Sequence, residues 1–281
     1  MLNDRLEKLA AVNQAGEGIL SLTLAPNGVG RHDPLLDSLE FLRECGMDQL
    51  ILLACEPNAL KMAEITRAEA WLMNQEQVGR GSTDVFFDNV AAIRERFEDL
   101  PVVANPMVGD VVCYGQGRFL ERCVEIGVDG IDCAYYQCVA DPFGLCAEAA
   151  DAGVHFLGAV YASALDLANP VHTRLIEQVT LLSRGQLLFV SGVAGERRAI
   201  DGSRFAETMA YIRAVQAEHG IDARIVAVGG INTPEDAYQV TQVAGADGVH
   251  LASALIKRQR RGDSSDEIAS WLRELKAAMR R

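Results

Sequence analysis

The chain reads Arg224-Ile225-Val226-Ala227-Val228-Gly229-Gly230-Ile231-Asn232-Thr233-Pro234-Glu235-Asp236 near its carboxyl end. This stretch predicts a buried strand that runs into a double glycine and then into a helix opened by Thr233 and Pro234. Two glycines let the backbone approach a ligand closely, and a helix N-terminus presents unpaired N–H groups to an anion. We therefore expect Gly229 and Gly230 to bind a phosphate group, although glycines after a strand also make ordinary tight turns.

A second apolar segment follows and also ends in small residues. It reads Gly248-Val249-His250-Leu251-Ala252-Ser253-Ala254-Leu255. Neighbouring strand ends of this kind can share one phosphate, and (β/α)8 barrels often place a phosphate at the loops after strands seven and eight. Ala252 and Ser253 therefore join the predicted phosphate site.

Apolar runs of strand length recur along the whole chain with helical segments between them. Their continuous apolarity is typical of parallel strands that are covered on both faces. The predicted strands are Ile19–Ala25, Gln49–Cys55, Val102–Val108, Gly130–Tyr136, His155–Ala162, Gln186–Ser191, Arg224–Gly229 and Gly248–Ala252.

The predicted helices have recognisable caps and stops. They are Asn3–Gln14, Asp33–Cys45, Ser82–Phe97, Arg118–Ile126, Asp141–Ala152, Asn169–Leu182, Ser203–Glu218, Pro234–Val243 and Asp266–Arg280. A strand and a helix alternate about every 30 residues, which is the repeat of a βα unit. The sequence therefore predicts an α/β fold, a (β/α)8 TIM barrel with an extra N-terminal helix, as a single domain over residues 1–281.

The composition narrows the class of partner and the compartment. The 281 residues carry a formal charge of −13 from 39 acidic and 26 basic side chains, which disfavours nucleic-acid binding. The first residues lack a signal peptide, and no apolar run reaches the roughly 20 residues that span a bilayer. The seven cysteines have no C-x-x-C pair. We expect a cytoplasmic protein with reduced cysteines and no membrane contact.

The order and spacing of these segments resemble the tryptophan synthase alpha subunit family from Leu2 to about Lys276. The most specific matching motifs are Ser191–Glu196, Val228–Glu235 and Ala252–Lys257. The resemblance implies a (β/α)8 lyase that splits indole-3-glycerol phosphate, with a beta-type subunit as partner. It also implies a phosphate cradle that consists of Gly195, Gly229, Gly230, Ala252 and Ser253.

The catalytic positions of that family are different here. The family's strand-two glutamate, a general acid/base, corresponds to Ile51, and its aspartate in the following loop corresponds to Met62. An isoleucine cannot transfer a proton, so we expect the family's ordinary reaction to be lost. Asn105 and Asp132 stand where the family is apolar, which predicts a ligand more polar than indole.

Asp132 and Glu56 are the candidate acid/base residues. A carboxylate inside an apolar strand can act in proton transfer, although a hydrogen-bonded structural Asp132 is the alternative. Glu56 follows strand two directly and can replace the missing glutamate from a shifted position. Asp110 could join both carboxylates around a divalent cation, but no spacing requires it, and we expect neither a metal nor a cofactor.

The tyrosine and histidine side chains in the predicted strands can have a structural role or a role in the ligand site. Tyr136, like Tyr161, either lines the ligand pocket or packs in the core with a polar tip. We interpret His155 and His250, which lie inside predicted strands, as hydrogen-bonded wall residues and not as catalytic groups.

Three functions follow from these observations. The first is a lyase that binds a small phosphorylated metabolite and acts by acid/base chemistry. The second is a non-catalytic sensor or partner subunit that has kept the phosphate site. The third is a phosphosugar isomerase or aldolase, although no predicted strand supplies a Schiff-base lysine. The sequence leaves open whether a second copy or a beta-type subunit binds.

Overall fold

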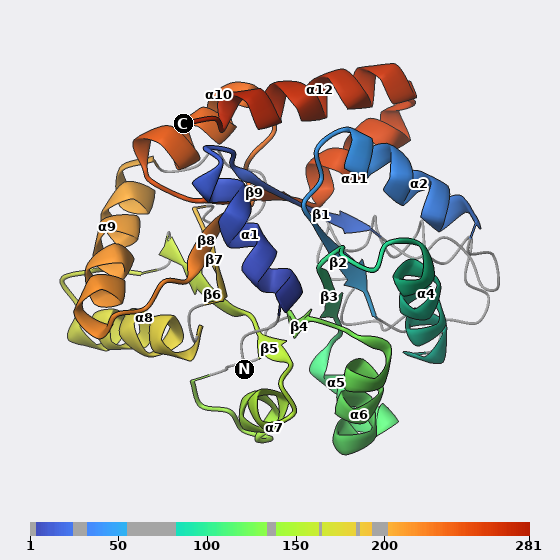
Figure 1. Ribbon diagram of the computed structural model, residues 1–281. Coiled ribbons are helices and arrows are strands. Elements are labelled where there is room, and N and C mark those ends of the chain that lie inside the picture. The colour runs from blue at the N-terminus through green and yellow to red at the C-terminus, as the bar shows by residue number, and fades with distance from the viewer. Residues whose placement is uncertain are drawn as a thin grey trace.

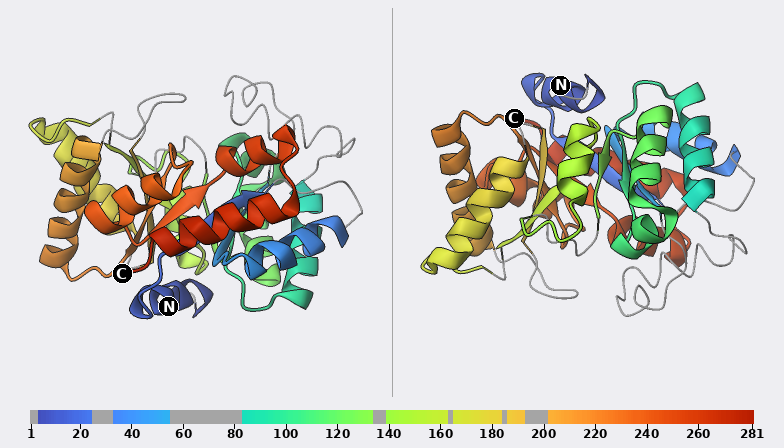
Figure 2. Two further views of the ribbon diagram at one scale, coloured as in Figure 1. Left: turned by 90° about the horizontal axis from the view of Figure 1, so that it is seen from above. Right: turned by 90° about the horizontal axis from the view of Figure 1, so that it is seen from below.

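A computed structural model describes residues 4–24, 33–54, 83–133, 139–162, 165–183, 186–192 and 202–281. The strands lie in the middle of the molecule, and helices surround them in chain order (Figure 1). The two further views, turned by 90°, show the N-terminal helix α1 lying at one end of the barrel (Figure 2). The predicted (β/α)8 barrel with an extra N-terminal helix is confirmed. No described helix combines the length and apolarity needed to span a membrane.

Within the described ranges, nine parallel strands form one sheet in the order β5-β4-β3-β2-β1-β9-β8-β7-β6. They are β1 Ile19–Leu24, β2 Gln49–Leu53, β3 Val102–Asn105, β4 Gly130–Ile131, β5 His155–Phe156, β6 Gly158–Tyr161, β7 Leu187–Ser191, β8 Arg224–Val228 and β9 Gly248–Leu251. Each of these strands except β6 begins within one residue of the start of a predicted strand.

The strands β5 and β6 are the two halves of one predicted strand, His155–Ala162. β5 pairs with β4, whereas β6 pairs with β7, so the ring closes where the chain changes neighbour at Leu157. The Leu157 N–H still donates to Ile131 O at 2.9 Å. The His155 Nε2 atom donates across the join to Leu187 O at 2.8 Å. The barrel therefore has the eight strands that the sequence predicts.

Helices follow the strands around the outside, and α1 precedes the first strand. Those described are α1 Asp4–Gln14, α2 Asp33–Glu44, α4 Thr83–Arg96, α5 Val108–Tyr114, α6 Gln116–Ile126, α7 Leu145–Asp151, α8 Pro170–Leu182, α9 Gly202–His219, α10 Pro234–Tyr238, the π-helical turn η3 Gln239–Val243, α11 Ser253–Arg261 and α12 Ser265–Ala278.

Several predicted boundaries were wrong, and the structure explains two of them. The third strand ends at Asn105 and not at Val108, because Pro106 has no N–H to continue a ladder and α5 begins two residues later. The predicted helix from Asp141 begins only at Leu145. The Asp141 carboxylate accepts hydrogen bonds from the backbone N–H groups of residues 146 and 147, so it caps the helix from outside.

Side chains alternate between the barrel interior and the outer core. In β1, for example, Leu20, Leu22 and Leu24 pack in the cluster between the sheet and the helices, whereas Ile19 belongs to a second cluster inside the barrel. Leu6 and Leu9 of α1 join this interior cluster. Helix α1 therefore closes the end of the barrel where the strands begin.

The strand starts are tied together by a repeated Gly-x-Asp triplet. It occurs as Gly46-Met47-Asp48, Gly127-Val128-Asp129 and Gly245-Ala246-Asp247, each directly before a strand. The glycines have φ values of 98°, 76° and 83°, which favour glycine, and each carboxylate accepts from a backbone N–H in the preceding strand at 2.7 or 2.8 Å. We call Asp48, Asp129 and Asp247 the amino rim.

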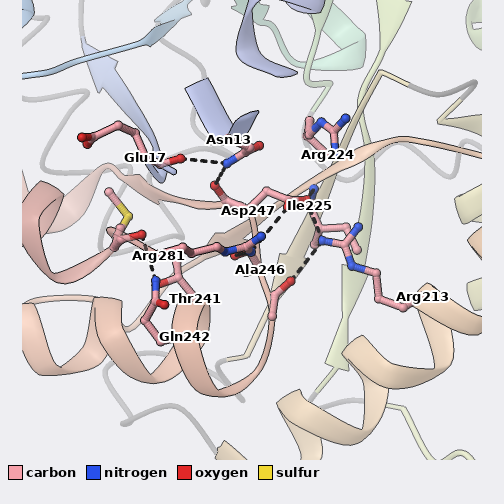
Figure 3. Close-up of polar contacts among 12 residues, drawn as sticks. Asn13, Glu17, Arg213, Arg224, Ile225, Thr241, Gln242, Ala246, Asp247 and Arg281 are labelled. Atoms are coloured by element: carbon pink, nitrogen blue, oxygen red, sulfur yellow. Dashed lines mark hydrogen bonds and ion pairs between the residues drawn. The ribbon is translucent and has the colours of Figure 1, made fainter. Parts of the chain in front are cut away.

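Basic side chains complete the amino rim. The fully buried Asp129 carboxylate pairs with Arg5 and Arg94, both at 2.6 Å. Asp247 pairs with Arg213 at 2.6 Å, and Asn13 of α1 donates to its backbone oxygen at 2.7 Å (Figure 3). Burial lowers the pKa of Arg94, and the negative charge of Asp129 opposes that shift. These paired charges fasten helices to the closed end of the barrel.

Candidate functional site

The predicted phosphate site lies where β8 and β9 end. The two strands are neighbours, with Val228 opposite His250, so the residues that follow them emerge side by side. Gly229 and Gly230 both have positive φ values, 82° and 73°, which a side chain would strain. The backbone conformation of these two residues therefore favours glycine at both positions.

The loop after β8 is held in place from behind. The Asn232 side chain donates to Gly230 O at 2.9 Å, and the indole N–H of Trp271 in α12 donates to Asn232 O at 2.9 Å. Arg258 of α11 stacks over the Trp271 ring at 4.3 Å. Two carbonyl groups of the loop thereby have hydrogen-bond donors, and α11 and α12 are linked to the same loop.

The start of α10 is capped by side chains of its own first turn. The Thr233 hydroxyl accepts from Asp236 N, and the Asp236 carboxylate accepts from the N–H groups of Asn232 and Thr233, both at 2.9 Å. This capping box satisfies the N–H groups of Asn232, Thr233 and Asp236 and places a negative charge at the helix start. The prediction that the start of α10 presents unpaired N–H groups is wrong for these three residues.

The start of α11 is different. Its N-cap residue is Ala252, which has no side-chain cap hydrogen bond, and the helix begins with Ser253. The first N–H groups of an α-helix have no partner within the helix, and an anion can occupy that position. Ala252 and Ser253 remain at the predicted site, and α11 is the helix whose N-terminus faces the ends of β8 and β9.

Two predicted site residues, Asn105 and Asp132, contact each other at adjacent strand ends. Asn105 is the last residue of β3 and is buried, and Asp132 directly follows β4. The Asn105 Nδ2 atom donates to both the backbone oxygen and the carboxylate of Asp132, each at 2.7 Å. A carboxylate held by an amide is oriented, which suits either a structural or an acid/base role.

A third polar group lies inside the barrel between β1 and β9. The imidazole of His250 lies between two hydroxyls, with Nδ1 3.0 Å from Ser21 Oγ and Nε2 2.9 Å from Thr23 Oγ1. Phe189 of β7 stacks on the ring at a centroid distance of 5.3 Å. His250 and His155 are both buried and hydrogen-bonded, as predicted.

The sequence reasoning missed Ser21 and Thr23. Their signal is present in the chain, because Ile-Leu-Ser-Leu-Thr-Leu alternates hydroxyl and leucine side chains within an otherwise apolar strand. We call Thr23, Asn105, Asp132 and Ser191 the carboxyl rim. Each of these polar side chains lies in the last two residues of a strand or directly after one.

The position where the family resemblance places a glutamate is apolar in the structure. Ile51 is almost fully buried and belongs to the interior cluster with Val103 and Val226. The same cluster contains Leu6 and Leu9 of α1. This placement agrees with the prediction that strand two supplies no proton-transfer group.

Other predicted site residues have different outcomes. Glu56, Tyr136 and Gly195 lie outside the described residues, so their roles stay predictions. Asp110 is buried, and its carboxylate accepts from Met107 N at 2.9 Å at the start of α5, which gives it a structural use. Tyr161 ends β6 with 53% of its surface exposed and is therefore not a core aromatic.

Comparisons with known proteins agree with this architecture. The tryptophan synthase alpha chain of Novosphingobium aromaticivorans is 32% identical over 214 residues, which is 74% of this chain and 73% of that protein. The alpha chain of Pelobacter propionicus is 32% identical over 171 residues, 60% of this chain and 57% of that protein. No protein-family model matches the chain.

Solved structures extend the likeness to nearly the whole chain. Tryptophan synthase subunit alpha of Legionella pneumophila superposes with a TM-score of 0.75 at 18% identity, over 99% of both chains. A Mycobacterium tuberculosis tryptophan synthase structure gives a TM-score of 0.77 at 18% identity, over 100% of both chains. At this identity the superpositions establish the shared barrel fold.

Proposed function

Because the chain belongs to the tryptophan synthase alpha chain family, we propose that it binds a small phosphorylated metabolite at the carboxyl end of its barrel and acts on it as a lyase. The observation that carries the proposal is the pair of neighbouring strand ends. Gly229 and Gly230 follow β8 with positive φ, and the uncapped start of α11 follows β9 beside them.

The phosphate would be held mainly by backbone N–H groups. Gly229, Gly230, Ala252 and Ser253 offer these groups from two adjacent loops, and the helix dipole of α11 favours a negative charge. A formal charge of −13 repels anions over most of the surface, so a local set of donors is needed. We expect Gly195 to complete the cradle from the loop after β7.

The chemistry would use a different carboxylate from that of the relatives. Asp132 is our candidate acid/base, oriented by Asn105, and Glu56 is the second candidate. Both Asn105 and Asp132 are polar at the open end of the barrel, which supports a ligand richer in hydroxyl groups than indole. Tyr136 would line the same space.

Titration calorimetry with inorganic phosphate and with glycerol 3-phosphate tests the cradle. We expect Gly230→Asp to weaken binding at least 10-fold, because a side chain at φ 73° strains the loop and its charge repels the anion. Gly245→Asp is the matched control, since Gly245 has φ 83° and lies at the amino rim, away from the site. Equal affinity in wild type and Gly230→Asp would refute the proposal.

The catalytic part has its own test. Once a phosphorylated compound that copurifies has been identified by mass spectrometry, Asp132→Asn should lower its turnover by about 10²- to 10⁴-fold. Inorganic phosphate should bind the variant as tightly as it binds the wild type. Unchanged turnover would remove Asp132 from the mechanism and leave Glu56 as the candidate.

A non-catalytic sensor is the alternative, and one observation favours it. Ile51 is packed in the apolar interior at the position of the relatives' expected acid/base, so the chain has kept the fold without that group. Phosphate binding that persists in Asp132→Asn and Glu56→Gln, with no turnover of any copurified compound by the wild type, would establish the sensor.

The assembly state completes the proposal. We propose a single-domain, cytoplasmic protein of residues 1–281 whose partner, if it follows its relatives, is a beta-type subunit. Light scattering of the purified chain, alone and mixed with a tryptophan synthase beta subunit, distinguishes that complex from a second copy of this chain and from a monomer.

A further inference from the structure

We propose that Ser21, His250 and Thr23 form a proton relay that opens at the carboxyl rim beside the phosphate cradle. The inference rests on the proposed lyase function and supplies a second proton-transfer group besides Asp132. Its basis is the line of contacts from Ser21 Oγ to His250 Nδ1, at 3.0 Å, and from His250 Nε2 to Thr23 Oγ1, at 2.9 Å.

All three side chains face the barrel interior. Their strand neighbours Leu20, Leu22 and Leu24 in β1, and Val249 and Leu251 in β9, pack in the outer core. Phe189, which stacks on the imidazole, belongs to the interior cluster that α1 closes from below. The His250 imidazole therefore lies between the interior apolar cluster on one side and the carboxyl end of the barrel on the other.

Thr23 is the member placed to meet a substrate. It is the last residue but one of β1, and Leu22 pairs with Leu251, which puts Thr23 in register beside Ala252. The phosphate cradle thus directly neighbours the outer hydroxyl of the relay. A substrate held by its phosphate would present the atoms next to the ester to Thr23 Oγ1.

The contacts of Thr23 with His250 match those of a hydroxyl that is activated by a neighbouring base. A hydroxyl that contacts an imidazole, whose other nitrogen is oriented by a third group, is the general pattern of base-assisted chemistry. Since a serine or threonine hydroxyl both donates and accepts, the neutral imidazole can present a bare Nε2 to Thr23 while Nδ1–H donates to Ser21. Thr23 would be the catalytic residue, and His250 and Ser21 the positioning residues behind it.

The proton step balances without any further reagent. For a carbon acid such as glycerone phosphate, the C–H bond beside the carbonyl breaks and its proton passes to Thr23 Oγ1, while the Thr23 hydroxyl proton passes to His250 Nε2. The electron pair left on carbon forms the enolate. The resulting imidazolium exchanges its proton with solvent and returns a proton to carbon by the same path.

Hydrogen exchange of glycerone phosphate in D2O, followed by ¹H NMR, tests the relay. We expect Thr23→Val and His250→Gln to slow exchange by about 10²- to 10⁴-fold, the usual range for loss of acid/base assistance. Thr23→Ser keeps the hydroxyl and should recover most of the rate. Thr180→Val is the matched control, because the buried Thr180 hydroxyl donates within α8 to Ile176 O.

Affinity for inorganic phosphate and thermal unfolding are measured on the same variants. Intact phosphate binding and folding together with lost exchange support the relay, because a merely structural hydroxyl would lower stability without changing the rate. Exchange by Thr23→Val at the wild-type rate, or a wild type that binds phosphate without exchange, overturns it. Thr23-dependent exchange without phosphate binding would refute the cradle and keep the relay.

Discussion

The two ends of the barrel are built from different chemistry. At the amino rim, Asp48, Asp129 and Asp247 each accept from a backbone N–H and pair with at least one basic side chain, which for Asp48 is Lys276 of α12. Helix α1 covers the strand starts. At the carboxyl rim, polar groups contact one another, as Asn105 contacts Asp132. The charged side chains of the amino rim form ion pairs that hold helices against the strand starts. The polar side chains of the carboxyl rim lie at the strand ends.

This difference agrees with how (β/α)8 barrels divide stability from function. Active sites of the fold are at the carboxyl ends of the strands, and conserved features at the other end maintain the structure. The prediction for this chain is that substitutions at the amino rim unfold it without altering ligand affinity. Substitutions at the carboxyl rim should change ligand affinity or turnover and should destabilise the fold less than those at the amino rim.

The largest expected effect is at the amino rim. Asp129→Ala removes a fully buried carboxylate that pairs with Arg5 and Arg94, and we expect it to lower the free energy of unfolding by about 3–5 kcal/mol. Urea unfolding measures this loss. The matched control is Asp99→Ala, which breaks the solvent-exposed Arg43–Asp99 pair and should cost only about 0–1 kcal/mol. Similar losses in both variants would contradict the amino rim's special role.

The second effect concerns the closure of the barrel by α1. Leu9 is buried in the interior cluster, and Leu9→Ala should destabilise the protein by about 2–5 kcal/mol through a cavity under the strands. Leu175→Ala on α8 is the control, because that side chain is 40% exposed and a surface change typically shifts stability by about 0.5 kcal/mol or less. Phosphate affinity of the folded Leu9→Ala protein should be unchanged, and a weakened affinity would connect the two ends.

A smaller effect is expected from the carboxyl rim. Asn105→Leu keeps the branched shape of the side chain but removes the amide that donates to Asp132, so the free energy of unfolding should fall by about 1–3 kcal/mol. The same variant should lose turnover, because Asp132 is no longer oriented. If Asn105→Leu is as active as the wild type, the pair is a structural contact only.

The sequence predicted the barrel because its signal is distributed over many residues. Eight apolar runs at a regular spacing define the fold even when one boundary is wrong, as with the strand that ends at Asn105. The closing join at Leu157 was not predictable, since pairing with β4 on one side and β7 on the other depends on tertiary register.

The candidate site was less predictable, because it depends on single contacts. Gly229 and Gly230 were recognised from the backbone freedom of glycine. The sequence also contains the Thr233–Asp236 capping box, which the prediction of an open helix start overlooked. The contact of His250 with two hydroxyls of another strand required the register between β1 and β9.

The smallest expected effect separates the two helix starts at the carboxyl end. Thr233→Ala removes the cap of α10 and should cost about 1 kcal/mol of stability, measurable in urea unfolding. It should leave phosphate affinity unchanged, because the Asp236 carboxylate still accepts from the N–H of Asn232. Ser253→Asp at the uncapped start of α11 should do the opposite. The new carboxylate should repel phosphate and weaken its binding, and its interaction with the helix dipole should stabilise α11 slightly. A stronger effect of Thr233→Ala than of Ser253→Asp on phosphate affinity would move the anion site back to α10.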